Sequence, residues 1–259
     1  MPAADLALLV DAARAAGEVA LGFTGATARS WDKPGDAGPV TEADLAVNDR
    51  LAGILKPARP DYGWLSEESP DSPDRLAMDR VFIIDPIDGT RSFIDGSSTW
   101  AHAIAVAEAG VVTAAVIYLP MRDELFAAAA GQGATLNGAP IAPSDTAGMK
   151  DATVLAARPA LESRHWKAGP PPFKREYRPS LAYRMATVAE GRFDGMLTLR
   201  RTWEWDVAAG DLILREAGAR VSDRLGQALR FNNPQPSVNG VLAGGAAVHA
   251  GLLAALTQS

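Results

Sequence analysis

The stretch from Val81 to Ile94, which reads VFIIDPIDGTRSFI, constrains the fold of this chain more than any other. Its four opening apolar residues are typical of a short buried strand, whose ladder Pro86 is predicted to end. Asp85 and Asp88 follow, with a glycine turn and the start of a short helix at Thr90. Carboxylates bind hard cations such as Mg²⁺, and free N–H groups at a helix start bind phosphate. The stretch therefore predicts a site where metal and phosphate meet, although an ordinary turn uses the same residues.

The spacing of the two aspartates excludes two other metal motifs. Phosphatases of the haloacid dehalogenase type place their aspartates two residues apart, whereas Asp85 and Asp88 are three apart. An EF-hand loop needs alternating acids, then a glycine and a distant glutamate, and that pattern is absent here.

Composition limits the class of protein and its partners. The chain has 259 residues, a net charge of −6 and no cysteine. The length favours one or two domains, and the acidic balance argues against a nucleic acid polymer as partner. No signal peptide is indicated at Met1–Val10, and glycines interrupt the weakly charged region 238–256, so we expect no membrane span. We therefore expect a cytoplasmic protein, in which cations would mediate contact with an acidic substrate.

Helical and strand patterns alternate along the whole chain, which predicts a mixed α/β fold. The polar segment 143–150 is predicted to separate an N-terminal subdomain, residues 1–143, from a C-terminal subdomain, residues 144–259. Residues 162–179 are rich in proline and basic side chains and are predicted to be a loop, either solvated or forming a basic wall for an anionic substrate. Helices are predicted at 5–23, 41–56, 181–190 and 207–217, and the principal strands at 62–65, 81–84, 100–106, 111–119, 124–130, 152–156 and 193–199.

Three further groups of acids have ordinary structural explanations when each is considered alone. Thr41 and Asp44 have the spacing of a capping box at a helix start. Glu67 and Glu68 fit solvated loop acids, and Asp206 fits an acid in the first turn of a helix.

Taken together, these pieces form a pattern that the separate explanations do not account for. The chain contains PVTEAD at 39–44, LSEES at 65–69, DPIDGT at 85–90 and WDVAAG at 205–210, in that order. Over essentially its whole length it resembles the inositol monophosphatase superfamily. The resemblance implies an alternating α/β layered sandwich and Mg²⁺-dependent hydrolysis of small phosphomonoesters, often inhibited by Li⁺, by a monomer or homodimer.

The resemblance also implies a role for each matching position. One Mg²⁺ would be held by Glu67, Asp85 and the Ile87 carbonyl, and a second by Asp85, Asp88 and Asp206. Two ions bridged by one carboxylate suit a two-metal hydrolase, and a third ion is compatible with the same residues. The three histidines are interpreted as structural, because Mg²⁺ prefers oxygen ligands.

The remaining implied roles concern the phosphate, the attacking water and the substrate. Gly89 and Thr90 would present N–H groups to the phosphate, and the Thr90 hydroxyl, oriented by Asp44, would position the water together with Glu67. Asp88 and Asp206 would also face the substrate. Lys33 lies in a loop that closes over the site in relatives.

The substrate is predicted from residues near the last motif. Inositol-specific relatives carry an acid shortly before the Trp-Asp pair, whereas residues 195–203 contain no acid but do contain Arg200 and Arg201. Arginines there would hold a second phosphate bidentately. LSEE and VAEG also resemble the bacterial branch that hydrolyses 3′-phosphoadenosine 5′-phosphate to AMP, which favours a 3′(2′),5′-bisphosphate nucleotidase.

Two other functions stay open at this point. One is hydrolysis of inositol 1-phosphate or another sugar phosphate by the same chemistry. The other is a non-catalytic regulator that binds cations or phosphate on the same scaffold. The regulator would have lost a metal carboxylate or the threonine, whereas all of them are present here.

Overall fold

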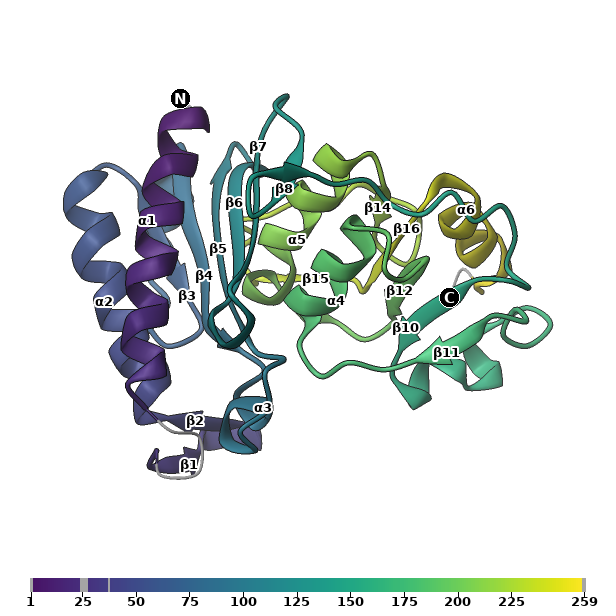
Figure 1. The fold of residues 1–259 in the computed structure, drawn as a ribbon, viewed down its shortest axis with the longest axis horizontal. Helices are drawn as coiled ribbons and strands as arrows, with labels where there is room; N and C mark the ends of the chain where they lie inside the picture. The colour runs from purple at the N-terminus through teal and green to yellow at the C-terminus, as the bar shows by residue number, and fades with distance from the viewer. Residues whose placement is uncertain (1, 24–27, 37, 258–259) are drawn as a thin grey trace.

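The computed structural model describes residues 2–23, 28–36 and 38–257. Helices and sheets alternate through the molecule in layers (Figure 1). Two helices cover one face of a seven-stranded sheet, two more lie between that sheet and a five-stranded sheet, and a last helix covers the far face. This confirms the predicted α/β layered sandwich. The five helices are α1 (Pro2–Leu21), α2 (Glu42–Ala58), α4 (Leu181–Ala189), α5 (Glu204–Ala217) and α6 (Ala246–Ala255).

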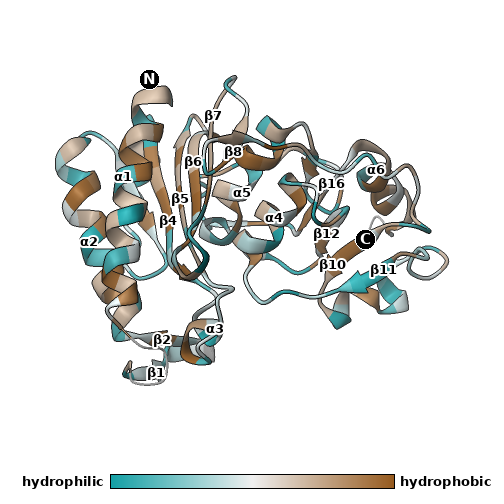
Figure 2. Cartoon of the chain, in the orientation of Figure 1, coloured by the Kyte–Doolittle hydropathy of each residue, from teal (hydrophilic) through white to brown (hydrophobic). Residues whose placement is uncertain are grey.

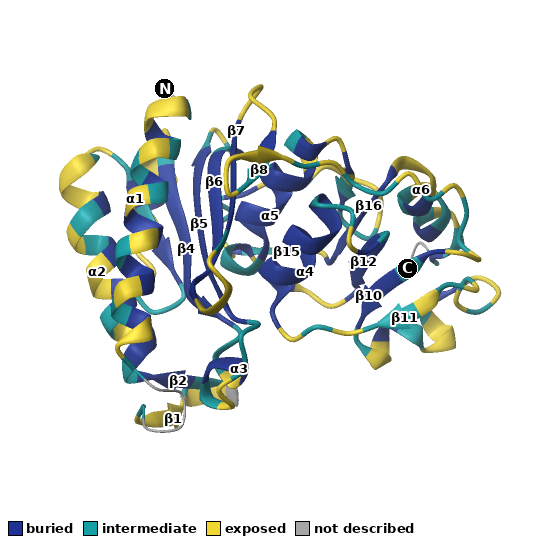
Figure 3. Cartoon of the chain, viewed as in Figure 1, coloured by how far each residue is buried: buried dark blue, intermediate teal, exposed yellow. Residues whose placement is uncertain are grey.

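The central strands of the seven-stranded sheet are buried on both faces (Figure 3). Side chains alternate across β4, so Phe82 and Ile84 pack beneath α1 and α2, while Val81 and Ile83 pack toward α4 and α5. This explains why the strand reads as a continuous apolar run, as its colouring in Figure 2 also shows. In spatial order the strands are β3 (Gly63–Ser66), β4 (Arg80–Asp88), β5 (Ala101–Glu108), β6 (Val111–Leu119), β7 (Glu124–Ala129), β8 (Ala134–Leu136) and β9 (Ala139–Pro140).

The five-stranded sheet follows the same rule. Leu155 and Ala243 face α4 and α5, whereas their neighbours Val154 and Leu242 face α6. In spatial order the strands are β11 (Lys174–Glu176), β10 (Thr153–Ala156), β12 (Gly195–Thr198), β16 (Val241–Gly244) and β14 (Arg220–Ser222). Two small ribbons complete the fold, β1 (Ser30–Asp32) with β2 (Pro39–Thr41), and β13 (Thr202–Trp203) with β15 (Ser237–Val238).

Strand β4 contains an irregularity that the sequence did not predict. The ladder was expected to end before Pro86, but β4 runs on to Asp88. Asp85 pairs with Ala103 of β5 and Asp88 pairs with Ala101, so three steps along β4 match two along its partner. The extra residue is a β-bulge, and the proline lies inside it, where the ladder is already interrupted.

The bulge changes which way the following side chains point. Ile83 and Ile87 are four residues apart and would share a face of a regular strand, yet Ile83 packs toward α4 and α5 while Ile87 packs beneath α1 and α2. By the same reversal Asp85 and Asp88, three residues apart, come to lie on one side. The short helix α3 (Thr90–Ile94) begins directly after Gly89, whose φ of 97° lies in the left-handed region.

The helix starts agree with the sequence in one case and differ in another. The predicted capping box at the start of α2 is confirmed, with Thr41 and Asp44 making both reciprocal bonds. Helix α5 begins at Glu204 rather than at the predicted Val207, which places Asp206 within its first turn. The helix ends at Gly218, whose φ is 94°.

The segment 162–179 is more ordered than predicted. It contains β11 and part of a run of short 3₁₀ turns, because its backbone pairs with β10 at the edge of the second sheet. The two sheets lie on either side of the predicted boundary near residue 143, with β9 ending at Pro140 and β10 beginning at Thr153. The division into two subdomains stays a prediction, since α4 and α5 contact both sheets.

Among the described residues, no helix combines the length and the apolar character that a membrane crossing requires.

The contact between α4 and α5 yields a stability prediction. A methyl group added at Gly210 of α5 would lie 2.6 Å from both Cβ and Sδ of Met185 on α4. We expect Gly210→Ala to lower the free energy of unfolding by about 1–2 kcal/mol, because overpacking outweighs the gain in helix propensity. Gly53→Ala in the exposed part of α2, where nothing lies within 4 Å, should instead stabilise by about 0.5–1 kcal/mol. Urea unfolding of both variants tests this, and equal effects would contradict it.

Candidate active site

A cavity of about 530 Å³ opens where the end of β4, the start of α3 and the first turn of α5 meet. Most of the residues singled out from the sequence line it. The predicted residues in its wall are Glu67, Asp85, Ile87, Asp88, Gly89, Thr90, Arg200 and Asp206.

Three carboxylates converge in this cavity. One oxygen from each of Glu67, Asp85 and Asp206 lies within 4.8 Å of the others. Asp85 is buried, and its Oδ1 has no hydrogen-bond partner. Burial, followed by repulsion from neighbouring carboxylates, raises the pKa of Asp85 and of Asp206 well above their usual range. Such a concentration of negative charge without matching donors is typical of a cation site.

Asp88 is held differently from the other acids. Its Oδ2 accepts hydrogen bonds from the Ser180 hydroxyl at 2.6 Å and from the Ala182 N–H at 2.5 Å. Burial raises the pKa of Asp88 to about 6, and these two donors oppose the rise. Asp88 lies outside the three-carboxylate group but in the same cavity wall.

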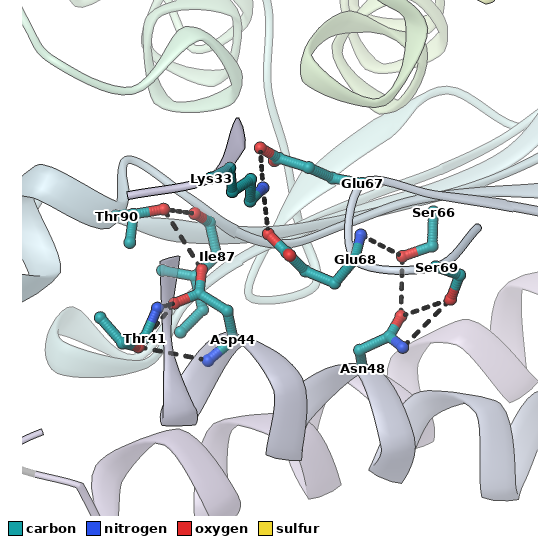
Figure 4. Close-up of polar contacts among 10 residues, drawn as sticks. All are labelled: Lys33, Thr41, Asp44, Asn48, Ser66, Glu67, Glu68, Ser69, Ile87 and Thr90. Carbon is teal, nitrogen blue, oxygen red and sulfur yellow. Dashed lines mark hydrogen bonds and ion pairs between the residues drawn. The ribbon is translucent and has the colours of Figure 1, made fainter. Parts of the chain in front are cut away.

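Thr90 lies between the end of β4 and the start of α2 (Figure 4). Its hydroxyl oxygen is 3.2 Å from both Asp44 Oδ1 and the Ile87 carbonyl oxygen. The other Asp44 oxygen accepts from the N–H and the hydroxyl of Thr41. Asp44 therefore takes part in the cap of α2 and contacts Thr90 at the same time. Its capping role is compatible with the predicted role of orienting the Thr90 hydroxyl.

Lys33 lies between two glutamates (Figure 4). Its Nζ is 2.7 Å from Glu67 and 2.6 Å from Glu68. Burial alone would lower the pKa of Lys33, but the two carboxylates outweigh it and raise the pKa. Burial raises the pKa of Glu68 to about 7 even though Lys33 opposes the rise. The ammonium group thus supplies part of the positive charge that this cluster needs.

His102 of β5 contacts the backbone of the bulge that carries these acids. The ring is fully buried, and its Nδ1 hydrogen-bonds the Pro86 carbonyl. Burial lowers the pKa of His102 to about 4, so the ring is neutral at pH 7. As a neutral ring it donates to the carbonyl from Nδ1.

A second cavity of about 400 Å³, which we call the arginine cavity, adjoins the first. Arg91, Tyr177, Pro179, Leu181 and Arg200 line both. Among the described residues, no acidic side chain lines the arginine cavity. Its basic side chains are Arg91, Arg164, His165, Arg184 and Arg200.

Arg184 was not singled out from the sequence, because there it reads as one polar residue on an apolar helix. It is 5% exposed, and its guanidinium donates to the backbone carbonyls of Arg178 and Pro179. It also lies over the ring of Tyr177, 4.6 Å from the centroid. No carboxylate among the described residues pairs with it within ion-pair distance. Arg201, by contrast, is exposed and is absent from the described walls of both cavities.

Glu204 is the acid nearest in sequence to Asp206, and it faces away from the cavity. Its buried carboxylate accepts three hydrogen bonds, from the backbone of Asn232 and from the backbone and side chain of Asn233. It therefore stabilises the start of α5.

The donor set fits Mg²⁺. All candidate ligands are oxygens, namely the carboxylates of Glu67, Asp85 and Asp206 and the nearby Ile87 carbonyl, and Asp85 Oδ1 lacks any other partner. Such a group of oxygen ligands is suited to cation-assisted hydrolysis of phosphomonoesters.

Comparison with known proteins agrees with the fold and identifies the family. The inositol monophosphatase family matches residues 3–259, so the chain belongs to that family and is a metal-dependent phosphomonoester hydrolase. It is 35% identical over 233 residues to Nus factor SuhB of Escherichia coli, 85% of each chain being covered. It is 33% identical to the inositol-1-monophosphatase of Mesorhizobium japonicum, covering 87% of this chain and 84% of that one.

Two further similarities span nearly the whole chain. Histidinol-phosphatase of Mycobacterium tuberculosis is 33% identical over 256 residues, covering 92% of this chain and 94% of that one. The crystal structure of the extragenic suppressor protein suhB from Bartonella henselae superposes with a TM-score of 0.82 at 30% identity over 99% of each chain.

The repulsion among the carboxylates predicts how the metal-free protein responds to mutation. Because the pKa of Asp85 is raised, its protonated form stabilises the fold at low pH, and this contribution is lost as pH rises through the folded-state pKa. In excess EDTA, Asp85→Asn should raise the melting temperature by about 2–6 °C near pH 8 and by less near pH 5. Differential scanning fluorimetry at both pH values measures this.

The control for this prediction is a buried aspartate with a cationic partner. Burial raises the pKa of Asp211 too, but Arg215, 3.0 Å away, opposes the rise, so Asp211→Asn should raise the melting temperature in EDTA by less than Asp85→Asn does. A drop for Asp85→Asn at both pH values would show that repulsion does not dominate at this site.

Proposed function

We propose that this protein is a Mg²⁺-dependent 3′(2′),5′-bisphosphate nucleotidase that hydrolyses 3′-phosphoadenosine 5′-phosphate to AMP and phosphate. The observation that carries the proposal is the arginine cavity, which adjoins the carboxylate cavity and shares five lining residues with it. A substrate that spans both would place one phosphate beside the cations and a second anionic group beside the arginines.

The carboxylate cavity provides the reaction. Glu67, Asp85 and the Ile87 carbonyl would hold one Mg²⁺, and Asp85, Asp88 and Asp206 a second; a third ion is compatible with the same residues. Bound there, the ions would offset the charge on the phosphate, activate the attacking water and stabilise the leaving alkoxide.

The protein's own groups orient the phosphate and the water. Gly89 and Thr90 line the cavity, and their N–H groups would bind phosphate oxygens. The Thr90 hydroxyl, in contact with Asp44, would position the water together with Glu67. Lys33 would add positive charge beside Glu67.

The arginine cavity provides the selectivity. Guanidinium groups bind phosphate in a bidentate fashion, and none of the described residues in the cavity wall is an acid that would compete with the substrate. Tyr177 lines both cavities and is 48% exposed, so its ring offers an aromatic surface for a nucleobase between the two phosphate positions.

Inositol 1-phosphate is the second candidate, because the relative from Mesorhizobium japonicum is named inositol-1-monophosphatase. Sugar hydroxyls are commonly bound by an acidic side chain. Glu204, the acid nearest in sequence to Asp206, already accepts hydrogen bonds from Asn232 and Asn233. This observation favours the nucleotide as the substrate.

We also propose for this chain the Li⁺ inhibition, the cytoplasmic location and the monomeric or dimeric state that the family resemblance implies.

The decisive experiment is phosphate release in Mg²⁺ from four substrates. These are 3′-phosphoadenosine 5′-phosphate, fructose 1,6-bisphosphate, inositol 1-phosphate and histidinol phosphate. We expect the highest kcat/KM for the nucleotide. A higher value for inositol 1-phosphate would overturn the proposed substrate, and equal values for both bisphosphates would remove the role of the base.

Arg200 and Arg201 form a matched pair for testing the second-anion contact. Arg200 lines both cavities and Arg201 neither. Arg200→Ala should raise KM for the nucleotide bisphosphate about 10–100-fold, since a charged hydrogen bond contributes about 1.5–3 kcal/mol. Its effect on AMP-sized monophosphates should be small, and Arg201→Ala should change neither. Steady-state kinetics of both variants on both substrate types measure these KM values. Equal changes in KM for Arg200→Ala and Arg201→Ala would refute the contact.

A further inference from the structure

We propose that Ser180 is a positioning residue for Mg²⁺ binding, because it holds the Asp88 carboxylate in the orientation in which one oxygen stays available to the cation. The inference rests on the proposed function, in which Asp88 is a ligand of the second ion. Ser180 lies ninety-two residues further along the chain than Asp88, at the start of α4.

The direction of the hydrogen bond between the two residues follows from the partners of Ser180. The side chain is fully buried, and its oxygen accepts from the Tyr183 N–H at 2.9 Å as the N-cap of α4. A hydroxyl has one proton to donate, and its only other polar contact within the described part of the chain is with Asp88 Oδ2 at 2.6 Å. Ser180 therefore donates its hydroxyl proton to Asp88 Oδ2.

This bond selects which oxygen of Asp88 is free. Oδ2 accepts from both Ser180 and the Ala182 N–H, and each bond is 2.6 Å or shorter. Oδ1 carries neither bond and is left for a cation. Removing a group that holds a metal ligand in place typically lowers the metal affinity about 10–100-fold.

The bond also connects the two halves of the site. Asp88 is delivered by the bulge in β4, whereas Ser180 and Ala182 belong to the helix between the two sheets. A side chain on Gly89, next to Asp88, would lie 3.3 Å from Ser180 Cβ, so the two segments are in close contact here. The geometry of the second ion site thus depends on how α4 docks against β4.

The ordinary explanation is that Ser180 only caps α4. A cap needs the acceptor oxygen alone, whereas contact with Asp88 needs the proton. Two substitutions separate these roles. Ser180→Ala removes the donor and also the N-cap, while Ser180→Gly removes the donor but weakens the cap much less.

The test is calorimetric titration of the metal-free full-length protein with Mg²⁺, together with melting temperatures. We expect Ser180→Ala and Ser180→Gly to weaken one Mg²⁺ binding event by a similar factor, about 10–100-fold, although they differ in stability. Ser180→Thr keeps the hydroxyl and should keep the affinity. Activity of Ser180→Ala should recover toward the wild-type kcat as Mg²⁺ is raised, which a purely structural loss would not do.

The matched control is Thr187, a buried hydroxyl on the same helix. It hydrogen-bonds only the carbonyls of Tyr183 and Arg184, so Thr187→Ala should leave the Mg²⁺ affinity unchanged. Affinities within twofold of wild type in both Ser180→Ala and Ser180→Gly would overturn the inference. If both Ser180 variants keep the wild-type affinity, Asp88→Asn then shows whether the proposed metal site is also wrong. Mg²⁺ binding and turnover that survive in Asp88→Asn would overturn the site itself. Their loss in Asp88→Asn would leave the site standing and reject only the role of Ser180.

Discussion

One extra residue in β4 is the constraint on which the site depends. In a regular strand Asp85 and Asp88 would point to opposite faces of the sheet, and one of them would enter the core beneath α1 and α2. The bulge reverses the alternation, so that both acids reach one cavity while Ile87 fills the core instead. Pro86 suits the bulge because it has no N–H to leave unpaired. The neutral ring of His102 binds the carbonyl that the irregularity exposes.

Gathering carboxylates in this way is costly, and the surrounding groups offset only part of the cost. Asp88 has two donors and Glu67 has Lys33, but Asp85 Oδ1 has no partner. Repulsion that the rest of the fold must sustain is a direct consequence of a site preorganised for cations. The sheet can sustain it because β4 lies between β3 and β5 and is buried by helices on both faces.

The sequence predicted the features that depend on neighbours in the chain. The capping box of Thr41 and Asp44, the strands β5 and β6, and the layered fold all have local or family-wide patterns. The bulge was missed, because Pro86 alone indicates an interruption but not that the ladder resumes. Ser180 and Arg184 were missed because their importance comes from α4 docking beside β4, a contact between distant segments. Arg200 and Arg201 were indistinguishable in sequence, since only the backbone path between β12 and β13 decides which one reaches the cavity.

One cavity is lined by carboxylates and the other by basic side chains. In the proposed function, this difference would decide which cavity selects the substrate. Cations bound by carboxylates would accept the phosphate of almost any monoester, so discrimination falls to the arginine cavity. Arg184 is buried there with backbone carbonyls but no paired carboxylate, and a buried guanidinium in that state is destabilising unless an anion joins it. A substrate with a second phosphate would supply that anion. A neutral alcohol would cover the guanidinium without replacing its lost hydration, and would be penalised for it. Selectivity would therefore come as much from rejection of uncharged substrates as from attraction of charged ones.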